Sequence, residues 1–181
     1  GFIGHRWPHR IGEVCQGLLF GAVAVIGMLN PMELAPGLFF DGRSVVISLC
    51  ALYFGPLSTI VAVVMAAGCR IMQGGIGTYS GVAVVISSAL IGLIFHYRPR
   101  STRYIGSVEL VGFGACVHIS MLLIMLTLPA GIGWYVLRQV GLHVALTFPI
   151  ATVIIGKILS DQELRRHHFE ELQESNNRFR A

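Results

Sequence analysis

Long uncharged stretches, separated by single charges or small charged groups, dominate the chain. They cover residues 14–32, 44–69, 71–97, 110–137 and 139–156. Each is close to, or longer than, the roughly 18–20 residues with which a helix crosses the hydrocarbon core of a bilayer. The apolar residues run continuously rather than alternating with polar ones, which argues against the strands of an outer-membrane barrel. The pattern predicts an all-α fold, a polytopic integral membrane bundle of helices.

The second stretch carries Gly55-Pro56 near its middle. Glycine often ends a helix, and proline fits the first turn of the next one. We therefore expect two short helices arranged as a hairpin and six spans in all, whereas a continuous helix would leave five. The expected spans are 11–29, 40–54, 56–72, 77–97, 108–128 and 136–159.

Basic residues set the expected orientation. If both termini of a six-span bundle are cytoplasmic, only Arg43, Arg70 and Arg138 of the 13 lysines and arginines face outward. Basic residues favour cytoplasmic loops, so this arrangement is preferred. Five spans with the same cytoplasmic C-terminus would move Arg6 and Arg10 outward. We expect a cytoplasmic segment at 1–10, a membrane domain at 11–160 and a cytoplasmic helix at 161–181.

Composition agrees with a membrane environment. Hydrophobic residues make up 54% of the chain and charged residues 12%, against about 25% charged in a soluble domain. The net charge of +4 comes from basic residues at loops and ends, so we expect membrane lipid and no nucleic acid as a partner. The four cysteines have no CxxC spacing, and we expect them to be small packing residues.

Polar residues within apolar surroundings are the candidate functional residues, because an ionisable group at membrane depth is costly. The hairpin would bring Arg43 and Arg70 to the outer face, where two guanidinium groups beside glycine backbone could hold a carboxylate. Alternatively, Asp41 pairs with one of these arginines and only fixes the loops; both roles are compatible. The candidate ligand-binding residues are Asn30, Glu33, Asp41, Arg43, Arg70, Gln73, Gly74 and Gly75.

Two histidines form the second-choice site. His118 and His143 fall within the fifth and sixth expected spans. A histidine pair in a membrane could hold haem or a metal, but such residues more often make an interhelical hydrogen bond. We therefore expect no cofactor and no metal, and we find no motif for catalytic residues in this chain.

The polar C-terminal segment has a short heptad pattern. Phe169 and Asn176 occupy a positions, with Leu172 and Phe179 at d. This spacing suits a parallel coiled coil of a homodimer in which Asn176 sets the register. A plain amphipathic surface helix remains the alternative.

Three motifs, in this order, resemble the membrane sensor domain of LytS/YhcK-type five-transmembrane receptors. They are Asp41-Gly42-Arg43, then Tyr53-Phe54-Gly55-Pro56, then Cys69-Arg70-Ile71-Met72-Gln73-Gly74-Gly75. That family typically has an Arg before a short helix, a Gly-Pro break and an Arg-x-x-x-Gly-Gly sequence. Many members carry Asn where Asp41 stands, so ligand chemistry is not transferred. Residues 171–181 are similar to the helix that leads into a PAS domain.

The resemblance implies a sensory input domain of a bacterial signalling receptor in the inner (plasma) membrane. Such a domain binds a small solute near the outer face, and the two arginines, rather than the resemblance, indicate an anionic one. It relays the change to a cytoplasmic PAS and output module of the histidine kinase (two-component) or cyclic-di-GMP type, so an enzymatic activity would belong to that module. A weaker likeness to six-helix S components makes the substrate-binding membrane subunit of a transporter the alternative.

Overall fold

The computed structural model describes residues 6–29, 32–35, 38–40, 42–99, 105–128 and 132–180, without the side chains of 6–9, 32–40, 163, 166–171 and 173–180. The helices are α1 (Arg6–Leu29), α2 (Arg43–Gln73), α3 (Thr78–His96), α4 (Ser107–Met125) and α5 (Ile132–Arg180). All five are long and apolar enough to cross a membrane, α1 from Arg10 and α5 as far as Gln162. The predicted helical membrane bundle is confirmed at this level.

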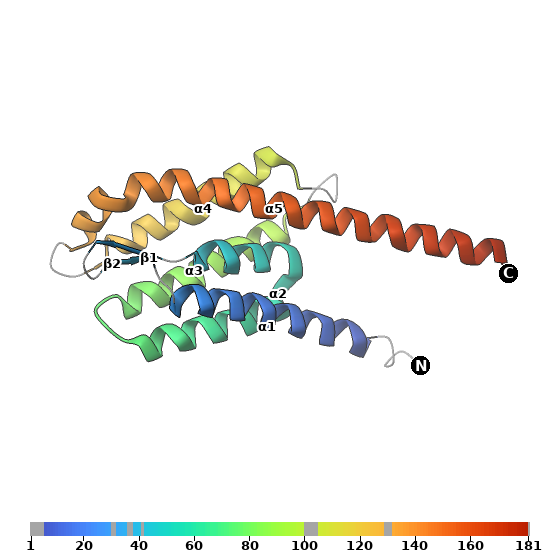
Figure 1. The fold of residues 1–181 in the computed structure, drawn as a ribbon, viewed down its shortest axis with the longest axis horizontal. Coiled ribbons are helices and arrows are strands. Elements are labelled where there is room, and N and C mark those ends of the chain that lie inside the picture. Colours follow the sequence, from blue (N-terminus) through green and yellow to red (C-terminus); the bar gives the residue numbers. More distant parts are fainter. Residues whose placement is uncertain are drawn as a thin grey trace.

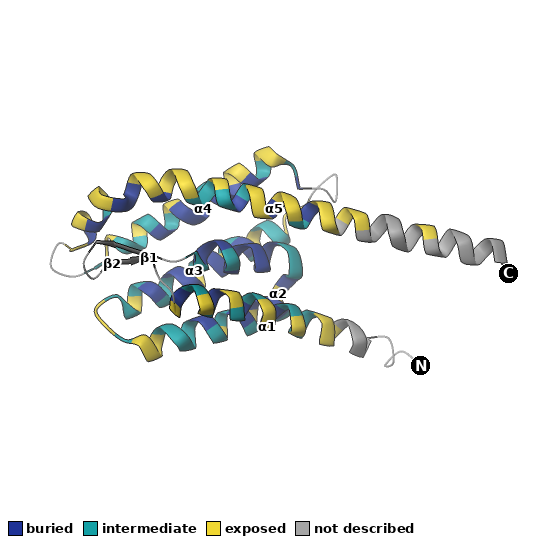
Figure 2. Ribbon diagram, viewed as in Figure 1, coloured by how far each residue is buried: buried dark blue, intermediate teal, exposed yellow. Residues whose placement is uncertain are grey.

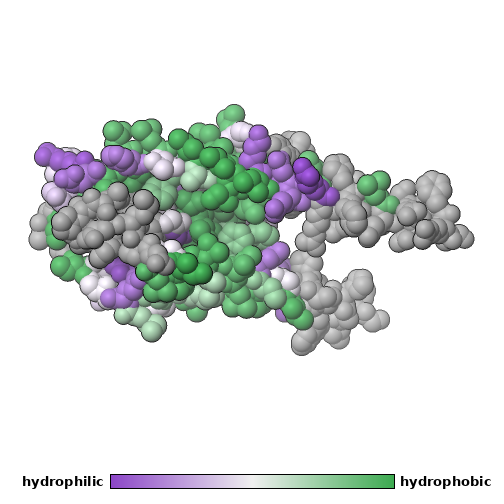
Figure 3. Space-filling model, in the orientation of Figure 1, coloured by the Kyte–Doolittle hydropathy of each residue, from purple (hydrophilic) through white to green (hydrophobic). Residues whose placement is uncertain are grey.

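The surface has the layered polarity of a membrane protein. Figure 3 shows a broad hydrophobic band between hydrophilic groups at the two ends of the bundle. Large apolar side chains on the outer faces of the helices are exposed, for example Ile60 and Val64 of α2 and Leu142 of α5. At the band's two margins, the guanidinium of Arg98 lies 6.0 Å from the centre of the Phe95 ring, and that of Arg138 lies 5.4 Å from the Trp134 ring.

Helix α2 is the central element of the bundle. In its most apolar window 61% of the residues are buried inside the protein, against 17% for α5. Figure 2 shows the first half of α2 almost wholly buried between α1, α3 and α5, whose outer faces are exposed. Because this first half is surrounded by protein, its polar residues cannot rely on water or lipid headgroups for hydrogen bonds.

The expected break in this stretch is confirmed, at Gly55. Gly55 has φ 75° and ψ −168° within α2, a conformation that residues with a Cβ avoid. Pro56 has no N–H, so the Leu52 carbonyl oxygen loses its partner within the helix. The Nδ1–H group of His96 on α3 donates to that oxygen instead, at 2.8 Å. The hydrogen bond lost at the break is therefore replaced by one from a neighbouring helix. We call Gly55-Pro56 the elbow.

The elbow divides α2 into two arms. Figure 1 shows the first arm, residues 43–54, running toward the end of the bundle that holds both termini, and the second arm, residues 56–73, running back. The first arm is about 18 Å long at 1.5 Å per residue, short of the roughly 30 Å hydrocarbon core. Five membrane-length helices are present in the described residues, so the predicted count of six spans is not confirmed.

A short β-ribbon precedes α2 and was not expected. Strand β1 (Met32–Ala35) pairs antiparallel with β2 (Leu38–Phe40), with Met32 opposite Phe40. The predicted span 40–54 therefore starts too early, since Phe40 belongs to a strand and the helix begins at Arg43. A strand pair of three or four residues depends on partner and context more than on propensity, so the sequence did not indicate it.

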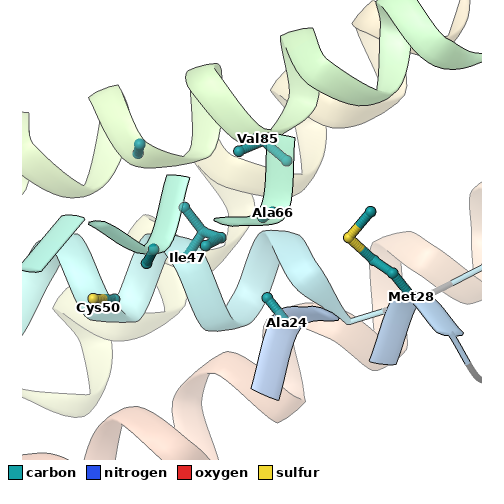
Figure 4. Packing of buried hydrophobic residues seen from close by; sticks show 8 residues of the cluster. Ala24, Met28, Ile47, Cys50, Ala66 and Val85 are labelled. Carbon is teal, nitrogen blue, oxygen red and sulfur yellow. The ribbon is translucent and has the colours of Figure 1, made fainter. Parts of the chain in front are cut away.

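Small residues let the helices approach closely. A Cβ at Gly17 of α1 would lie 2.6 Å from the Ser58 oxygen, and one at Gly21 would lie 2.6 Å from the Met65 sulfur. The GxxxG pattern of α1 thus packs against the second arm of α2 within the same chain. Figure 4 shows the resulting core, in which Ile47 of the first arm lies among side chains of α1, the second arm and α3.

Candidate ligand-binding site

Arg70 lies near the end of the second arm, and its side chain crosses the first turns of α3. A Cβ added at Gly81 would lie 2.5 Å from Arg70 Nε, and one added at Gly77 would lie 3.1 Å from Arg70 Nη2. The two glycines therefore leave the space that the arginine side chain occupies. Nη1 donates to Gln73 Oε1 at 3.4 Å and to the Gly74 oxygen at 3.3 Å. Both bonds are long, and Nε is buried with no hydrogen-bond partner. The guanidinium therefore keeps donor capacity for a further acceptor.

The neighbouring residues that the sequence singled out have structural roles. Gln73 Nε2 donates to the Met28 oxygen at 2.9 Å and ties the end of α2 to the end of α1. Gly74 and Gly75 have φ of 67° and 90°, so the turn from α2 into α3 requires glycine at both positions. The Thr78 N–H donates to the Gly75 oxygen at 3.1 Å across this turn.

Arg43 is the first residue of α2 and is half-buried. It lies 12 residues before Gly55, and Arg70 lies 15 residues after it. At 1.5 Å per residue these separations correspond to roughly 18 and 22 Å from the elbow. Because the two arms fold back on each other, both arginines lie toward the same end of the hairpin, opposite the elbow (Figure 1).

Three candidate residues lie outside the described part of the chain. Asn30 and Asp41 are not described, and Glu33 is described only as backbone, in β1 opposite Phe39. The predicted pairing of Asp41 with an arginine therefore stays a prediction.

The two histidines of the second-choice site have different environments. His118 on α4 is 1% exposed, and its ring stacks on Phe148 of α5 with centroids 5.3 Å apart. Its Nδ1–H donates to the Gly114 oxygen at 2.7 Å, while Nε2 has no partner. His143 is exposed on α5. Within the described residues no group of three His, Cys, Asp or Glu side chains could hold a metal ion, and all four cysteines are free.

One functional candidate escaped the sequence reasoning. The Tyr53 hydroxyl donates to the Gly156 oxygen of α5 at 2.7 Å and lies 2.7 Å from Ser160 Oγ. Because a phenol has one hydrogen, Tyr53 accepts from Ser160 while it donates to Gly156. The signal for Tyr53 in the sequence is its place in the Tyr-Phe-Gly-Pro motif, which indicates a helix break and a family resemblance but no contact to α5.

Together, these residues make up the candidate site. Two arginines near one end of the α2 hairpin provide donors for an anion, and the other end of the same hairpin is bonded to α5.

Comparisons with known proteins assign the chain to a family. No curated protein and no solved structure matches it. The model of one family, described as "5TMR of 5TMR-LYT", matches residues 3–162. The matched range includes the described membrane-length part of every helix, from α1 to the point at Gln162 where that part of α5 ends. The chain therefore belongs to the 5TMR-LYT family, as its resemblance to LytS-type receptors implied, and is a multi-pass membrane sensory input domain of a signalling receptor.

Proposed function

We propose that this domain binds a small carboxylate between Arg43 and Arg70 and signals through α5. The ligand would offer two acceptor oxygens to the guanidinium groups. Asp41, two residues from Arg43 in sequence, would compete for the same donors when no ligand is bound. Competition of this kind gives two states that a ligand can shift.

One observation carries the proposal: the first arm of α2 begins with an arginine and has a contact to α5 at its other end. Arg43 begins the arm, and Tyr53 near its end is hydrogen-bonded to Gly156 and Ser160 of α5. The arm is a short helix packed in the core, so displacement at its start is passed to its end. A ligand that moves Arg43 would thereby change the position of α5.

The output side of the proposal rests on the length of α5. This helix continues without a break from Ile132 to Arg180, well past the membrane-length part that ends at Gln162. Movement in the membrane would thus reach the C-terminal segment directly. We propose that this segment pairs with its copy in a homodimer through Phe169, Leu172, Asn176 and Phe179. It would lead to a PAS domain and a histidine kinase or cyclic-di-GMP module.

The topology proposal uses the elbow. Counting the two arms separately gives six membrane segments, which leaves both termini on one side, as they lie in Figure 1. We place that side in the cytoplasm of a bacterial cell with an inner membrane, because α3 ends there and is followed by Arg98, with Arg100 and Arg103 next in the sequence. Arg43 and Arg70 then face the outside.

The test is calorimetric titration of the purified protein with acetate, propionate, lactate and succinate. Arg43→Lys and Arg70→Lys keep the charge but lose the guanidinium fork. Loss of a charged hydrogen bond costs roughly 1.5–3 kcal/mol, so we expect each variant to bind about ten- to a hundred-fold more weakly. Arg138→Lys, a partner of Trp134 at the same margin of the bundle, is the matched control. Unchanged affinity in both variants, or no binding of any acid to the wild type, would contradict the proposal.

A further inference from the structure

The outer side of α5 carries polar side chains at membrane depth. His143 and Thr147 are both exposed and lie one turn apart, on one face of the helix. They come five and nine residues after Arg138, which lies at the margin of the hydrophobic band, so they are about 8 and 14 Å deeper at 1.5 Å per residue. Within a hydrocarbon core of roughly 30 Å, Thr147 is close to the middle, where lipid tails offer no hydrogen bonds.

Neither side chain has a hydrogen-bond partner within the described part of the chain. The comparable residues that pack inside the bundle do have one: the Thr152 hydroxyl donates to the Phe148 oxygen at 2.8 Å, and His118 donates to the Gly114 oxygen at 2.7 Å. An imidazole and a hydroxyl that face lipid without a partner are costly. A monomer surrounded by lipid therefore leaves this face of α5 unsatisfied.

The two polar residues belong to a longer exposed stripe. Figure 2 shows the outer side of α5 exposed along its membrane part, and only 17% of its most apolar window is buried, the smallest share among the five described helices. Spacings of three or four residues keep one side chain per turn on the same face. We call this set of exposed residues the α5 stripe: Gln139, His143, Thr147, Ile150, Ile154 and Ile158.

The stripe continues on the same face into the C-terminal segment. Leu172 lies 29 residues after His143, which is eight turns at 3.6 residues per turn, and its side chain is 68% exposed. Both residues belong to one continuous helix. Leu172 is among the residues through which we propose that the C-terminal segments pair. A second copy that contacts Leu172 would therefore lie on the side of α5 that carries the stripe.

Symmetry limits the chemistry that can pair across an interface between two copies. Both copies have the same orientation in the membrane, so a two-fold axis between them runs along the membrane normal, and residues beside it meet their own counterparts at equal depth. Charged residues would repel their counterparts, and residues 139–156 carry no charge. An amide, a neutral imidazole and a hydroxyl each contain a donor and an acceptor. Gln139, His143 and Thr147 can therefore each bond to their own counterpart.

We infer that the α5 stripe is the membrane part of a homodimer interface, in which His143 and Thr147 hydrogen-bond to the same residues of a second copy. This inference rests on the homodimer of the proposed function and adds the surface through which its membrane domains meet. Gly156, whose oxygen accepts from Tyr53, comes two residues after Ile154 and so lies on the opposite side of α5. The elbow therefore holds α5 on one side, and the second copy holds it on the other.

The experiment is disulfide crosslinking of single-cysteine variants of the full chain in membranes, in a cysteine-free background. His143→Cys, Thr147→Cys and Ile154→Cys should form crosslinked dimers. Ile155→Cys, at the next position of the same helix, and Ile60→Cys on α2 are the matched controls, since both side chains are exposed but lie outside the stripe. They should crosslink weakly. Equal crosslinking at all five positions would mean random collision, and stronger crosslinking at Ile60 would place another helix at the interface; either result would overturn the inference.

Association in dilute lipid, measured by energy transfer between labelled copies, tests the hydrogen bonds. His143→Leu and Thr147→Val keep apolar bulk but remove the polar groups, and each should weaken association about three- to ten-fold, as expected for an interhelical hydrogen bond. Leu142→Val, an exposed position beside the stripe, should leave association unchanged. Wild-type association in both polar variants would overturn the pairing of these residues with their counterparts.

The crosslinks also separate this inference from the proposed function. If Leu172→Cys crosslinks but the stripe positions do no better than Ile155→Cys, the stripe is overturned and the pairing of the C-terminal segments stands. If no position crosslinks and the labelled copies do not associate, both the homodimer and the stripe are overturned. Acid binding by Arg43 and Arg70 is measured separately, so neither result changes its outcome.

Discussion

At the scale of single residues, the fold depends on a few positions where the backbone leaves regular helix geometry. Gly55 is the clearest, because its φ of 75° lies in the region that favours glycine. The carbonyl group that Pro56 leaves without a helical partner is satisfied by a side chain from another helix, His96. One residue thus sets the direction of the chain, and another compensates for the hydrogen bond that the change of direction removes.

Gly55→Ala should lower the free energy of unfolding. The extended conformation with positive φ that Gly55 adopts costs a residue with a Cβ about 1–3 kcal/mol, and the added Cβ would lie 3.3 Å from His96 Nε2. Thermal unfolding in detergent measures the effect. Gly68→Ala is the control in the same helix, since its Cβ would meet nothing within 4 Å and its φ is helical; it should be neutral or slightly stabilising. Equal melting temperatures for the two variants would show that the elbow is not strained by a side chain.

At the scale of elements, the first arm of α2 links the bundle's parts. Near the elbow, α2 contacts three other helices through polar groups. In the first arm, Leu52 accepts from His96 of α3 and Tyr53 bonds to α5; in the second arm, Ser58 Oγ donates to the Glu13 oxygen of α1 at 2.8 Å. Hydrogen bonds between helices in a membrane are directional contacts that fix rotation as well as distance. The elbow is therefore the place where α5 is held relative to the α2 hairpin.

Tyr53→Phe should loosen this junction, because it removes the hydroxyl that binds Gly156 and Ser160 while keeping the ring. We expect a loss of about 0.5–1.5 kcal/mol in the free energy of unfolding. Ser160→Ala should cost less, since the bond to the Gly156 oxygen remains, and the double variant should be less than additive. Tyr79→Phe, whose side chain is 90% exposed, is the matched control. Additive losses in the double variant would mean that Tyr53 and Ser160 act separately.

At the scale of the whole molecule, the arrangement of charges and of the termini predicts how the domain sits in the membrane. The chain ends lie at one end of the bundle, and the turn that follows α2 lies at the other (Figure 1). The elbow lets a chain of five helices begin and end on the same side, since it adds one reversal of direction.

Single cysteines in a cysteine-free background test the topology in cells. A membrane-impermeant thiol reagent should label Cys at Thr78, beside the α2–α3 turn, and at Glu33. It should fail to label Cys at Ser101 or Asp161 until the cells are opened. Labelling at Ser101 from outside would reverse the orientation. Labelling at Asp161 but not at Ser101 would mean that the chain crosses the membrane an odd number of times between these two positions.

Much of the fold could be predicted from the sequence because the membrane imposes simple rules. An uncharged stretch must form a helix in lipid, where every backbone group needs a partner, and four of the five helices lie close to their expected ranges. Gly55-Pro56 was also visible, since the two residues break a helix by their own covalent geometry. Arg43 and Arg70 stood out because charges are rare in such stretches.

The tertiary structure alone decided which residues meet. The β-ribbon before α2 depends on a pairing between two very short strands, which no local preference determines. Buried serines carry no signal in sequence, because a serine in an apolar helix commonly bonds to its own backbone, as Ser48 does to Val45; only the tertiary structure shows that Ser88 does not. The bond from Tyr53 to α5 spans 103 positions. Sequence determines local geometry and environment, whereas contacts between distant residues follow from the register and direction of packed helices.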